Sequence, residues 1–320
     1  MIGVMGAGAF GTALAVSLAQ AGREIRLWGR DAAAMAQMQS GRENAARLPG
    51  VTLPENLHPV ADADLLAEAE VILLAVPTQK LADLLRIYRG LLNGKTLVAC
   101  NKGIDTKTLE GPSALIGQYC SLSHPAVLTG PSFAADIARG RPTALTLAYA
   151  WSDATRLQTQ LSTPNLRLYL TDDLIGAELG GALKNVTAIA CGAAMGAGLG
   201  ESARAAVMTR GYAEMQRLAL SQGARPETLG GLSGFGDLAL TCTSDGSRNY
   251  RYGYALGSGA PLPQGKTVEG IHTATAMARL ATKRGIEMPL CQLVADLVAG
   301  HISVDQAVNE ALSRPLTKEA

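Results

Sequence analysis

The sequence has few cysteines, and none of them are spaced as in a metal site or a redox motif. Its five cysteines form an odd and scattered set: Cys100, Cys120, Cys191, Cys242 and Cys291. The four histidines are isolated as well, at His58, His124, His272 and His301. Such a pattern argues against a disulfide framework and against zinc. We therefore predict a cytoplasmic protein without a metal site.

Long apolar runs and an excess of one charge are also missing. The formal net charge is +1, which argues against a partner such as nucleic acid or an anionic membrane surface. No stretch offers the roughly 18 uncharged apolar residues that a membrane span needs. The apolar segment 1–22 lacks a basic start and is interrupted by glycines, so we do not expect it to be a signal peptide. An anionic substrate would have to be held by a few placed cations.

The chain is long and apolar enough to form two domains, each with its own hydrophobic core, since it has 320 residues of which 48% are hydrophobic. Short apolar runs alternate with amphipathic segments through the first half, which predicts a doubly wound, Rossmann-type α/β domain with a parallel sheet. The expected strands are 2–5, 24–28, 71–76, 96–100, 126–129, 144–148 and 167–170. The expected helices are 10–20, 32–40, 61–69, 79–88, 109–120, 132–139 and 153–162.

The pattern changes near residue 171, after which no strand is expected. Residues 172–199 form one long apolar stretch rich in Gly and Ala, and helical periods follow at 202–222, 273–284, 290–299 and 303–313. Ser303 has the character of an N-cap for the last of these helices. We predict a dinucleotide-binding domain over 1–171 and an all-helical substrate and catalytic domain over 172–320.

A glycine-rich turn follows the first expected strand, with the sequence Gly6-Ala7-Gly8-Ala9-Phe10-Gly11. This GxGxxG spacing provides a tight turn, a close approach to a pyrophosphate and close packing of helix on strand. The amide groups of the following helix N-terminus then face the phosphates. We predict that this turn binds a dinucleotide.

The end of the second expected strand bears on the choice of dinucleotide. An NAD-specific site usually places a carboxylate there, but this chain has Arg30 followed by Asp31. A guanidinium suits the 2′-phosphate of NADP, while Asp31 could cap the next helix or reach the ribose of NAD. NADP(H) is favoured and NAD(H) remains open.

Polar residues follow two further strands. Lys102 comes after the strand at 96–100, and Gly130 and Ser132 come after the strand at 126–129. Ligands of open α/β sheets bind at the carboxyl ends of the strands, so these residues outline one wall of a cleft. Taken alone, a lysine at a strand end is more often simply solvated.

The helical half adds a lysine, a carboxylate and an anion-binding tripeptide. Within 175–199 the charged residues are Glu178 and Lys184, and burial lowers the pKa of a lysine toward the range of a catalytic acid. Asp237 lies beside Gly234 and Gly236, and Ser247-Arg248-Asn249 offers donors to a phosphate. The alternatives are a lysine that reaches solvent and a serine that merely caps a helix.

Together these motifs resemble the bacterial NAD(P)-dependent sn-glycerol-3-phosphate dehydrogenases, in order and approximate spacing along the whole chain. The resemblance rests on the glycine turn, Asn101-Lys102-Gly103, Gly130-Pro131-Ser132-Phe133, Lys184-Asn185, the segment 234–242, Ser247-Arg248-Asn249 and Val268-Glu269-Gly270. It implies reversible hydride transfer between NAD(P)H and dihydroxyacetone phosphate, which supplies glycerol phosphate for phospholipid synthesis. It also implies a homodimer.

The resemblance assigns roles to individual residues. Lys184 would be the general acid, and Asp237 would orient it or the substrate. Substrate contacts would come from Lys102, Gly130, Ser132, Lys184, Asp237, Ser247, Arg248 and Asn249. Cofactor contacts would come from Gly6, Gly8, Ala9, Phe10, Gly11, Arg30, Lys102, Ala134, Arg248, Thr267 and Glu269.

Two positions depart from the family pattern, and two other functions stay open. Met195 and Ser202 stand where an aspartate and an asparagine are expected, which bears on the junction of two helices or on a dimer surface. A β-hydroxyacid or ketopantoate-type reductase shares the two-domain plan, although its carboxylate substrate would not need the Ser-Arg-Asn set. A non-catalytic dinucleotide sensor would not need both Lys184 and Asp237.

Overall fold

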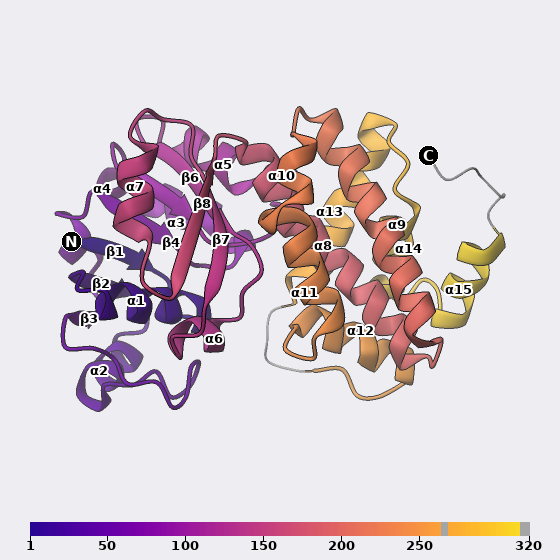
Figure 1. The fold of residues 1–320 in the computed structure, drawn as a ribbon, viewed down its shortest axis with the longest axis horizontal. Coiled ribbons are helices and arrows are strands. Elements are labelled where there is room, and N and C mark those ends of the chain that lie inside the picture. Colours follow the sequence, from indigo (N-terminus) through magenta and orange to yellow (C-terminus); the bar gives the residue numbers. More distant parts are fainter. Residues whose placement is uncertain (264–267, 314–320) are drawn as a thin grey trace.

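The computed structural model describes residues 1–263 and 268–313, which form a sheet-containing half and a helical half (Figure 1). The described residues contain one eight-stranded sheet in the order β3-β2-β1-β4-β5-β6-β7-β8. The strands are β1 (Ile2–Met5), β2 (Ile25–Trp28), β3 (Leu57–Val60), β4 (Val71–Leu74), β5 (Thr96–Ala99), β6 (His124–Thr129), β7 (Thr143–Ala148) and β8 (Leu166–Thr171). The predicted Rossmann-type sheet followed by a helical domain is confirmed.

Two details of the sheet differ from the sequence prediction. The pairing of β6 with β7 is antiparallel, whereas the other neighbours are parallel. The edge strand β3 was not predicted, because its four residues include an exposed histidine, His58, and a proline, Pro59. Proline lacks an amide proton, and within sheets it is found mainly on edge strands, near strand starts and at bulges. In β3 the histidine and the proline interrupt the apolar run by which the other strands were predicted.

Helices cover both faces of the sheet. Successive side chains of a strand point to opposite faces, and apolar residues on both faces need a covering layer. In β1 and β4, Val4 and Leu73 face a core with α1, α2, α6 and α7, while Met5 and Leu74 face a core with α3, α4 and α5. These helices are α1 (Ala9–Gln20), α2 (Ala32–Gly41), α3 (Thr78–Ile87), α4 (Arg89–Leu92), α5 (Pro112–Tyr119), α6 (Ala134–Ala138) and α7 (Ala154–Leu161). The helix predicted over 61–69 is only a short 3-10 turn, η1 (Ala63–Leu66).

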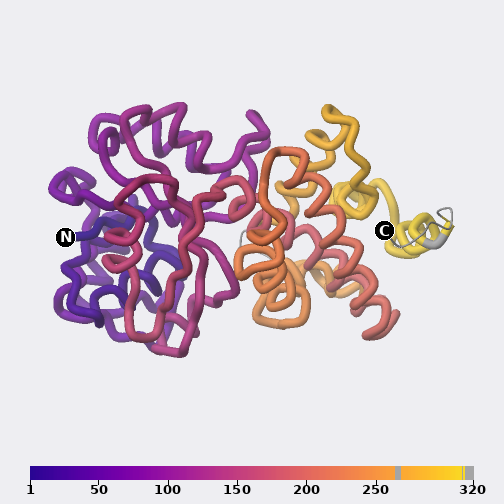
Figure 2. The backbone as a smooth tube through the Cα atoms, turned by 45° about the horizontal axis from the view of Figure 1, so that its top comes forward, coloured from indigo at the N-terminus to yellow at the C-terminus, as the bar shows by residue number. Residues whose placement is uncertain are grey.

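The helical half is built around α8 (Leu174–Gly196), most of which is buried. Around it lie α9 (Gly200–Ser221), α10 (Pro226–Gly230), the π-helical turn η2 (Leu232–Gly236), α11 (Asp237–Thr243), α12 (Arg248–Ser258), α13 (Glu269–Arg284), α14 (Pro289–Ala299) and α15 (Val304–Ser313). The tube view in Figure 2 shows this half beside the sheet domain, with the C-terminal helix at its far end. No described helix is both long and apolar enough to cross a membrane.

The helices over 226–258 were not predicted, because glycine, serine and threonine interrupt their apolar periods. The last helix was predicted with its cap. The Ser303 hydroxyl accepts the Gln306 amide, and the Gln306 side chain accepts the Ser303 amide. This reciprocal pair is a capping box.

Glycines bring α8 and α12 into backbone contact. A Cβ added at Gly253 of α12 would lie 2.0 Å from the carbonyl oxygen of Ile189 in α8, and one added at Gly192 would lie 2.0 Å from the carbonyl oxygen of Tyr250. Side chains at these positions would push the two helices apart. The contact therefore sets where the N-terminus of α12 lies relative to the middle of α8.

We expect Gly253→Ala to lower the free energy of unfolding by about 1–3 kcal/mol, because the added methyl group overpacks this contact. The control is Gly117→Ala on the exposed side of α5, where nothing lies within 4 Å of the new Cβ. That change should be neutral or should stabilise by about 0.4–1 kcal/mol. Urea unfolding measures both, and equal effects of the two substitutions would contradict the close helix contact.

Candidate active site

The glycine turn lies at the carboxyl end of β1, between β2 and β4 in the sheet. Gly6 has φ +123°, and a Cβ there would lie 2.5 Å from the carbonyl oxygen of Ala75. A Cβ at Gly11 would lie 2.1 Å from the Gly6 carbonyl oxygen. Gly8, which precedes α1, has nothing within 4 Å of its Cβ position. The open space before a helix N-terminus fits a pyrophosphate group.

Residues after β2 lie beside this turn. A Cβ at Gly29 would be 3.2 Å from the Cβ of Ala7, and the next residue, Arg30, is exposed. Asp31 accepts the amide of Ala34 at 3.0 Å and so caps α2. Of the two roles open for Asp31, the structure shows the helix cap. Arg30 directly follows Gly29, which lies beside the glycine turn, and an exposed cation there fits the 2′-phosphate of NADP.

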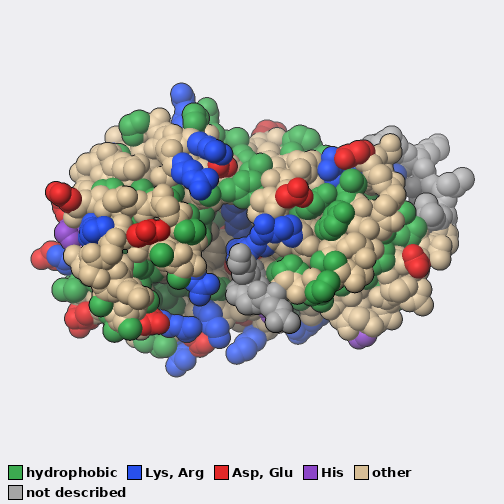
Figure 3. Space-filling view, turned by 90° about the horizontal axis from the view of Figure 1, so that it is seen from below, with side chains coloured by type: hydrophobic (Ala, Val, Ile, Leu, Met, Phe, Trp, Pro, Cys, Tyr) green, Lys and Arg blue, Asp and Glu red, His purple; other side chains and the backbone are tan. Residues whose placement is uncertain are grey.

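The buried carboxylate of Asp237 joins the two halves of the molecule. Asp237, at the start of α11, is fully buried. Its Oδ2 accepts Lys102 Nζ at 2.6 Å, and its Oδ1 accepts Lys184 Nζ at 2.5 Å. Lys184 also donates to Thr241 Oγ1 at 2.7 Å. The predicted residues Lys102, Lys184 and Asp237 thus converge, and Figure 3 shows lysine and arginine side chains around the hollow between the two halves.

The environment tunes the ammonium group of Lys184. Burial lowers the pKa of Lys184 to about 8, with the Asp237 carboxylate opposing that shift and the Lys102 ammonium adding to it. A charge taken out of water is destabilised unless it is paired. The result is a protonated amine that gives up its proton far more readily than an ordinary lysine.

The turn after β6 forms the wall beside Lys102. Gly130 has φ +138°, and its carbonyl oxygen accepts Lys102 Nζ at 2.9 Å and the Ser132 hydroxyl at 3.3 Å. Ala134 begins α6 and is partly buried against the sheet core. Phe10 of α1 packs against the same core. The predicted residues Gly130 and Ser132 therefore lie with Lys102 in one cluster.

The Ser-Arg-Asn set begins α12. The Ser247 hydroxyl accepts the amide of Tyr250 and caps the helix, and Arg248 is exposed in the first turn. Asn249 is buried: its Nδ2 donates to Asn185 Oδ1 at 2.8 Å, and its Oδ1 accepts the Gly270 amide at 3.0 Å. In this structure Ser247 and Asn249 therefore bond within the protein, and Arg248 is the member directed outward.

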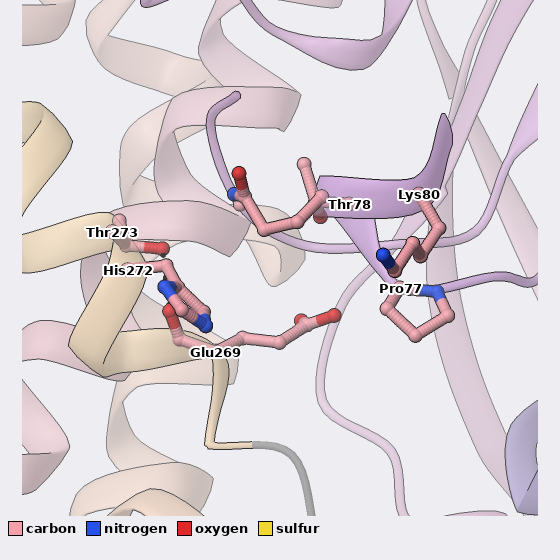
Figure 4. Close-up of a pocket in the computed structure, with 8 residues that line it drawn as sticks. Pro77, Thr78, Lys80, Glu269, His272 and Thr273 are labelled. Atoms are coloured by element: carbon pink, nitrogen blue, oxygen red, sulfur yellow. Dashed lines mark hydrogen bonds between the residues drawn. The ribbon is translucent and has the colours of Figure 1, made fainter. Parts of the chain in front are cut away.

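A cavity of about 180 Å³ lies between the start of α3 and the start of α13 (Figure 4). It is lined by Pro77, Thr78, Gln79, Lys80, Gly103, Glu269, His272 and Thr273. Burial raises the pKa of the Glu269 carboxyl, while the Arg248 charge and the backbone amide of Thr78 oppose that shift. Glu269 thus comes close to both halves of the molecule. Thr267, also predicted to contact the cofactor, lies outside the described residues.

The sequence analysis gave no role to three residues of this site, although Thr241 and Asn185 belong to the motifs that carry the family resemblance. Thr241 follows Asp237 by one helical turn, so the spacing of a helix over 237–243 could have indicated it. Thr78 accepts Asn101 Nδ2 at 3.1 Å, and Asn185 holds Asn249. These two contacts join residues far apart in sequence, and no local pattern indicates them.

Comparisons with known proteins agree along the chain. The family model described as the N-terminus of NAD-dependent glycerol-3-phosphate dehydrogenase matches residues 1–155. The model of the C-terminus of the same family matches residues 173–309.

Individual relatives match over nearly their full length. The chain is 58% identical over 322 residues to glycerol-3-phosphate dehydrogenase (NAD(P)+) of Cereibacter sphaeroides, covering 100% of both chains. It is 57% identical over 319 residues to the enzyme of that name from Paracoccus denitrificans, covering 99% of both. A crystal structure of glycerol-3-phosphate dehydrogenase from Coxiella burnetii superposes with a TM-score of 0.94 at 37% identity, covering 98% of both chains. The chain belongs to the NAD-dependent glycerol-3-phosphate dehydrogenase family.

Proposed function

We propose that this protein interconverts dihydroxyacetone phosphate and sn-glycerol 3-phosphate by hydride transfer with NAD(P)H, and so supplies glycerol phosphate for phospholipid synthesis. The observation that carries the proposal is the buried Asp237, which holds the ammonium groups of Lys102, from the carboxyl end of β5, and Lys184, from the middle of α8. The relatives' shared name supports the same reaction. The homodimer and the cytoplasmic location stay predictions.

Lys184 is the proposed general acid. Reduction of a ketone develops negative charge on its oxygen, and a buried ammonium group stabilises that charge and donates the proton. Asp237 and Thr241 hold Nζ in place by hydrogen bonds of 2.5 and 2.7 Å. Lys102 adds a second positive charge on the other carboxylate oxygen, and Gly130 and Ser132 complete this wall.

Arg248 is the proposed phosphate ligand, because it lies exposed at the N-terminus of an 11-residue helix. Ser247 shapes that terminus as its cap, and Asn249 fixes it to α8 and α13 through Asn185 and Gly270. A phosphate held there supplies binding energy that orients the reacting carbon.

The cofactor, when bound, supplies the hydride. The residues that would hold it begin with the turn Gly6, Gly8, Ala9, Phe10 and Gly11 and continue with Arg30, Lys102, Ala134, Arg248 and Glu269. The open space at Gly8 and the exposed Arg30, which follows Gly29 at the edge of the turn, fit a dinucleotide with a 2′-phosphate. Thr267 stays a prediction.

The test of function is NADPH oxidation by the purified protein with and without dihydroxyacetone phosphate. We expect turnover with this ketone, and Lys184→Ala should lower kcat by about 10²–10⁴-fold because the proton donor is lost. Lys283→Ala, at an exposed lysine near the end of α13, should leave kcat unchanged. Turnover confined to a 2-keto acid would favour a ketopantoate-type reductase, and no turnover with any ketone would favour a sensor.

The preference for NADPH should depend on Arg30. A charge-assisted bond to the 2′-phosphate stabilises binding by about 1.5–3 kcal/mol, or roughly ten- to hundredfold in affinity. Arg30→Ala should therefore remove most of the preference for NADPH over NADH while NADH use stays nearly intact. Arg284→Ala, at an exposed arginine ending α13, is the control. Equal efficiencies with both cofactors in the unmodified protein would instead make Arg30 a solvated surface residue.

A further inference from the structure

The second charged residue of the long apolar helix is unused by the proposed reaction. Glu178 lies in α8 six residues before Lys184, and it is buried. Its Oε1 accepts the Ser113 amide at 2.5 Å, and its Oε2 accepts the Ser113 hydroxyl at 2.9 Å. Ser113 lies in the first turn of α5, in the sheet-containing half. Glu178 therefore links the helix that carries Lys184 to the other half of the molecule.

The backbone around this link leaves no room for a larger residue. A Cβ added at Gly111 would lie 2.5 Å from Glu178 Oε2. Pro112, which has no amide proton, takes the first position of α5. The Ser113 amide is the next one along the chain, and it donates to Glu178. The sequence Gly111-Pro112-Ser113 therefore leaves room for the Glu178 carboxylate and provides a donor for it.

The segment 102–113 is fixed to the helical half along its length. At its start Lys102 Nζ donates to Asp237. Ile104 is buried in the core of the helical half, and the carbonyl oxygen of Thr106 accepts the Arg279 guanidinium at 2.9 Å. The Glu178 link to Ser113 fixes the other end of the segment.

We propose that Glu178 is a positioning residue: through Ser113 it holds the segment 102–113 against α8, and so keeps Lys102 and Lys184 on the same carboxylate, Asp237. This role rests on the proposed dehydrogenase function. Because Lys102 and Lys184 come from different halves, their separation depends on how the halves are joined. A displacement of about 1 Å at reacting groups costs up to roughly 100-fold in rate.

The ionisation of Glu178 gives this role a signature of its own. Burial raises the pKa of the Glu178 carboxyl to about 7, and the two hydrogen bonds from Ser113 oppose the shift. The charged residues nearest to Glu178 along the chain have other partners: Lys184 of α8 bonds to Asp237, and Asp173, which caps α8, accepts the amides of Gly176 and Arg225. No charged side chain of the described residues contributes to the raised value.

The sign of the pH effect follows from that value. A carboxyl whose pKa rises from 4.5 to about 7 on folding binds more protons in the folded state between those values. Its contribution to stability is therefore lost as pH rises from about 4.5 to about 7. Glu178→Gln cannot ionise, so the Tm of the unmodified protein minus that of Glu178→Gln should fall over this range and level off above it.

The kinetic test compares two buried helix-capping carboxylates. Glu178→Ala should lower kcat for dihydroxyacetone phosphate by about 10- to 100-fold while KM for NADPH changes by less than about twofold. Glu178→Gln should restore most of kcat, because its amide group can still accept from the Ser113 amide and donate to the hydroxyl. The control is Glu214→Ala, which removes a carboxylate that accepts the amides of Leu290 and Cys291 at the start of α14. It should lower Tm without lowering kcat.

A folded Glu178→Ala variant with unchanged kcat would overturn the proposal, as would equal losses of kcat in Glu178→Ala and Glu214→Ala. If Glu178→Ala does not fold, Ser113→Ala takes its place, because it keeps the amide that bonds to Glu178 and removes only the hydroxyl. Ser113→Ala should lower kcat by about two- to tenfold. An unchanged kcat in Ser113→Ala would also overturn the proposal. An unmodified protein without turnover would contradict the proposed function and not the positioning role.

In that case hydrogen exchange tests the positioning role. Faster exchange of the amides of residues 102–113 in Ser113→Ala than in Glu214→Ala supports the role of Glu178, and equal exchange in the two variants overturns it.

Discussion

The arrangement depends on one fully buried carboxylate that receives two ammonium groups from different parts of the chain. Asp237 is bonded to Lys102, which follows a strand of the sheet, and to Lys184, from the middle of α8. The ammonium group of the buried Lys184 depends on this carboxylate, because an unpaired buried charge is strongly destabilising. The ion pairs therefore join the two halves of the molecule at the point where we propose that reduction occurs. Burial and the second ammonium also explain why Lys184 is a better acid than an exposed lysine.

The rest of the helical half serves to place these groups. Glycine contacts bring α12 onto the backbone of α8, so the terminus that carries Arg248 is set relative to Lys184. Buried carboxylates then fix helix termini to their surroundings, Asp173 at α8, Glu178 at α5 and Glu214 at α14. Each satisfies amides that a helix N-terminus would otherwise leave unpaired. Charged residues are few in this chain, and several of its buried carboxylates accept hydrogen bonds from amides at helix N-termini.

Local chemistry explains what the sequence could predict. Apolar runs located seven of the eight strands, and the capping side chains of Asp31 and Ser303 marked the starts of α2 and α15. β3 was missed because Pro59 interrupts its apolar run. The helices over 226–258 were missed because small polar residues interrupt the helical spacing of their apolar side chains. Lys102, Lys184 and Asp237 were each predicted to be site residues, and the family resemblance offered a contact of Asp237 with Lys184 as one of two roles. The second lysine on the same carboxylate was not predicted, since residues 102 and 237 come together only through tertiary packing.

The most direct test of the central claim is the pH dependence of kcat/KM for dihydroxyacetone phosphate reduction, measured in the unmodified protein and in Asp237→Asn. Lys184 must be protonated to donate, so kcat/KM should fall as pH rises through about 8. The carboxylate opposes the loss of that proton, so in Asp237→Asn the fall should occur at lower pH. A profile that stays level up to the ordinary lysine value of 10.5, or one that moves to higher pH in Asp237→Asn, would contradict the claim that Asp237 holds Lys184 as the buried acid.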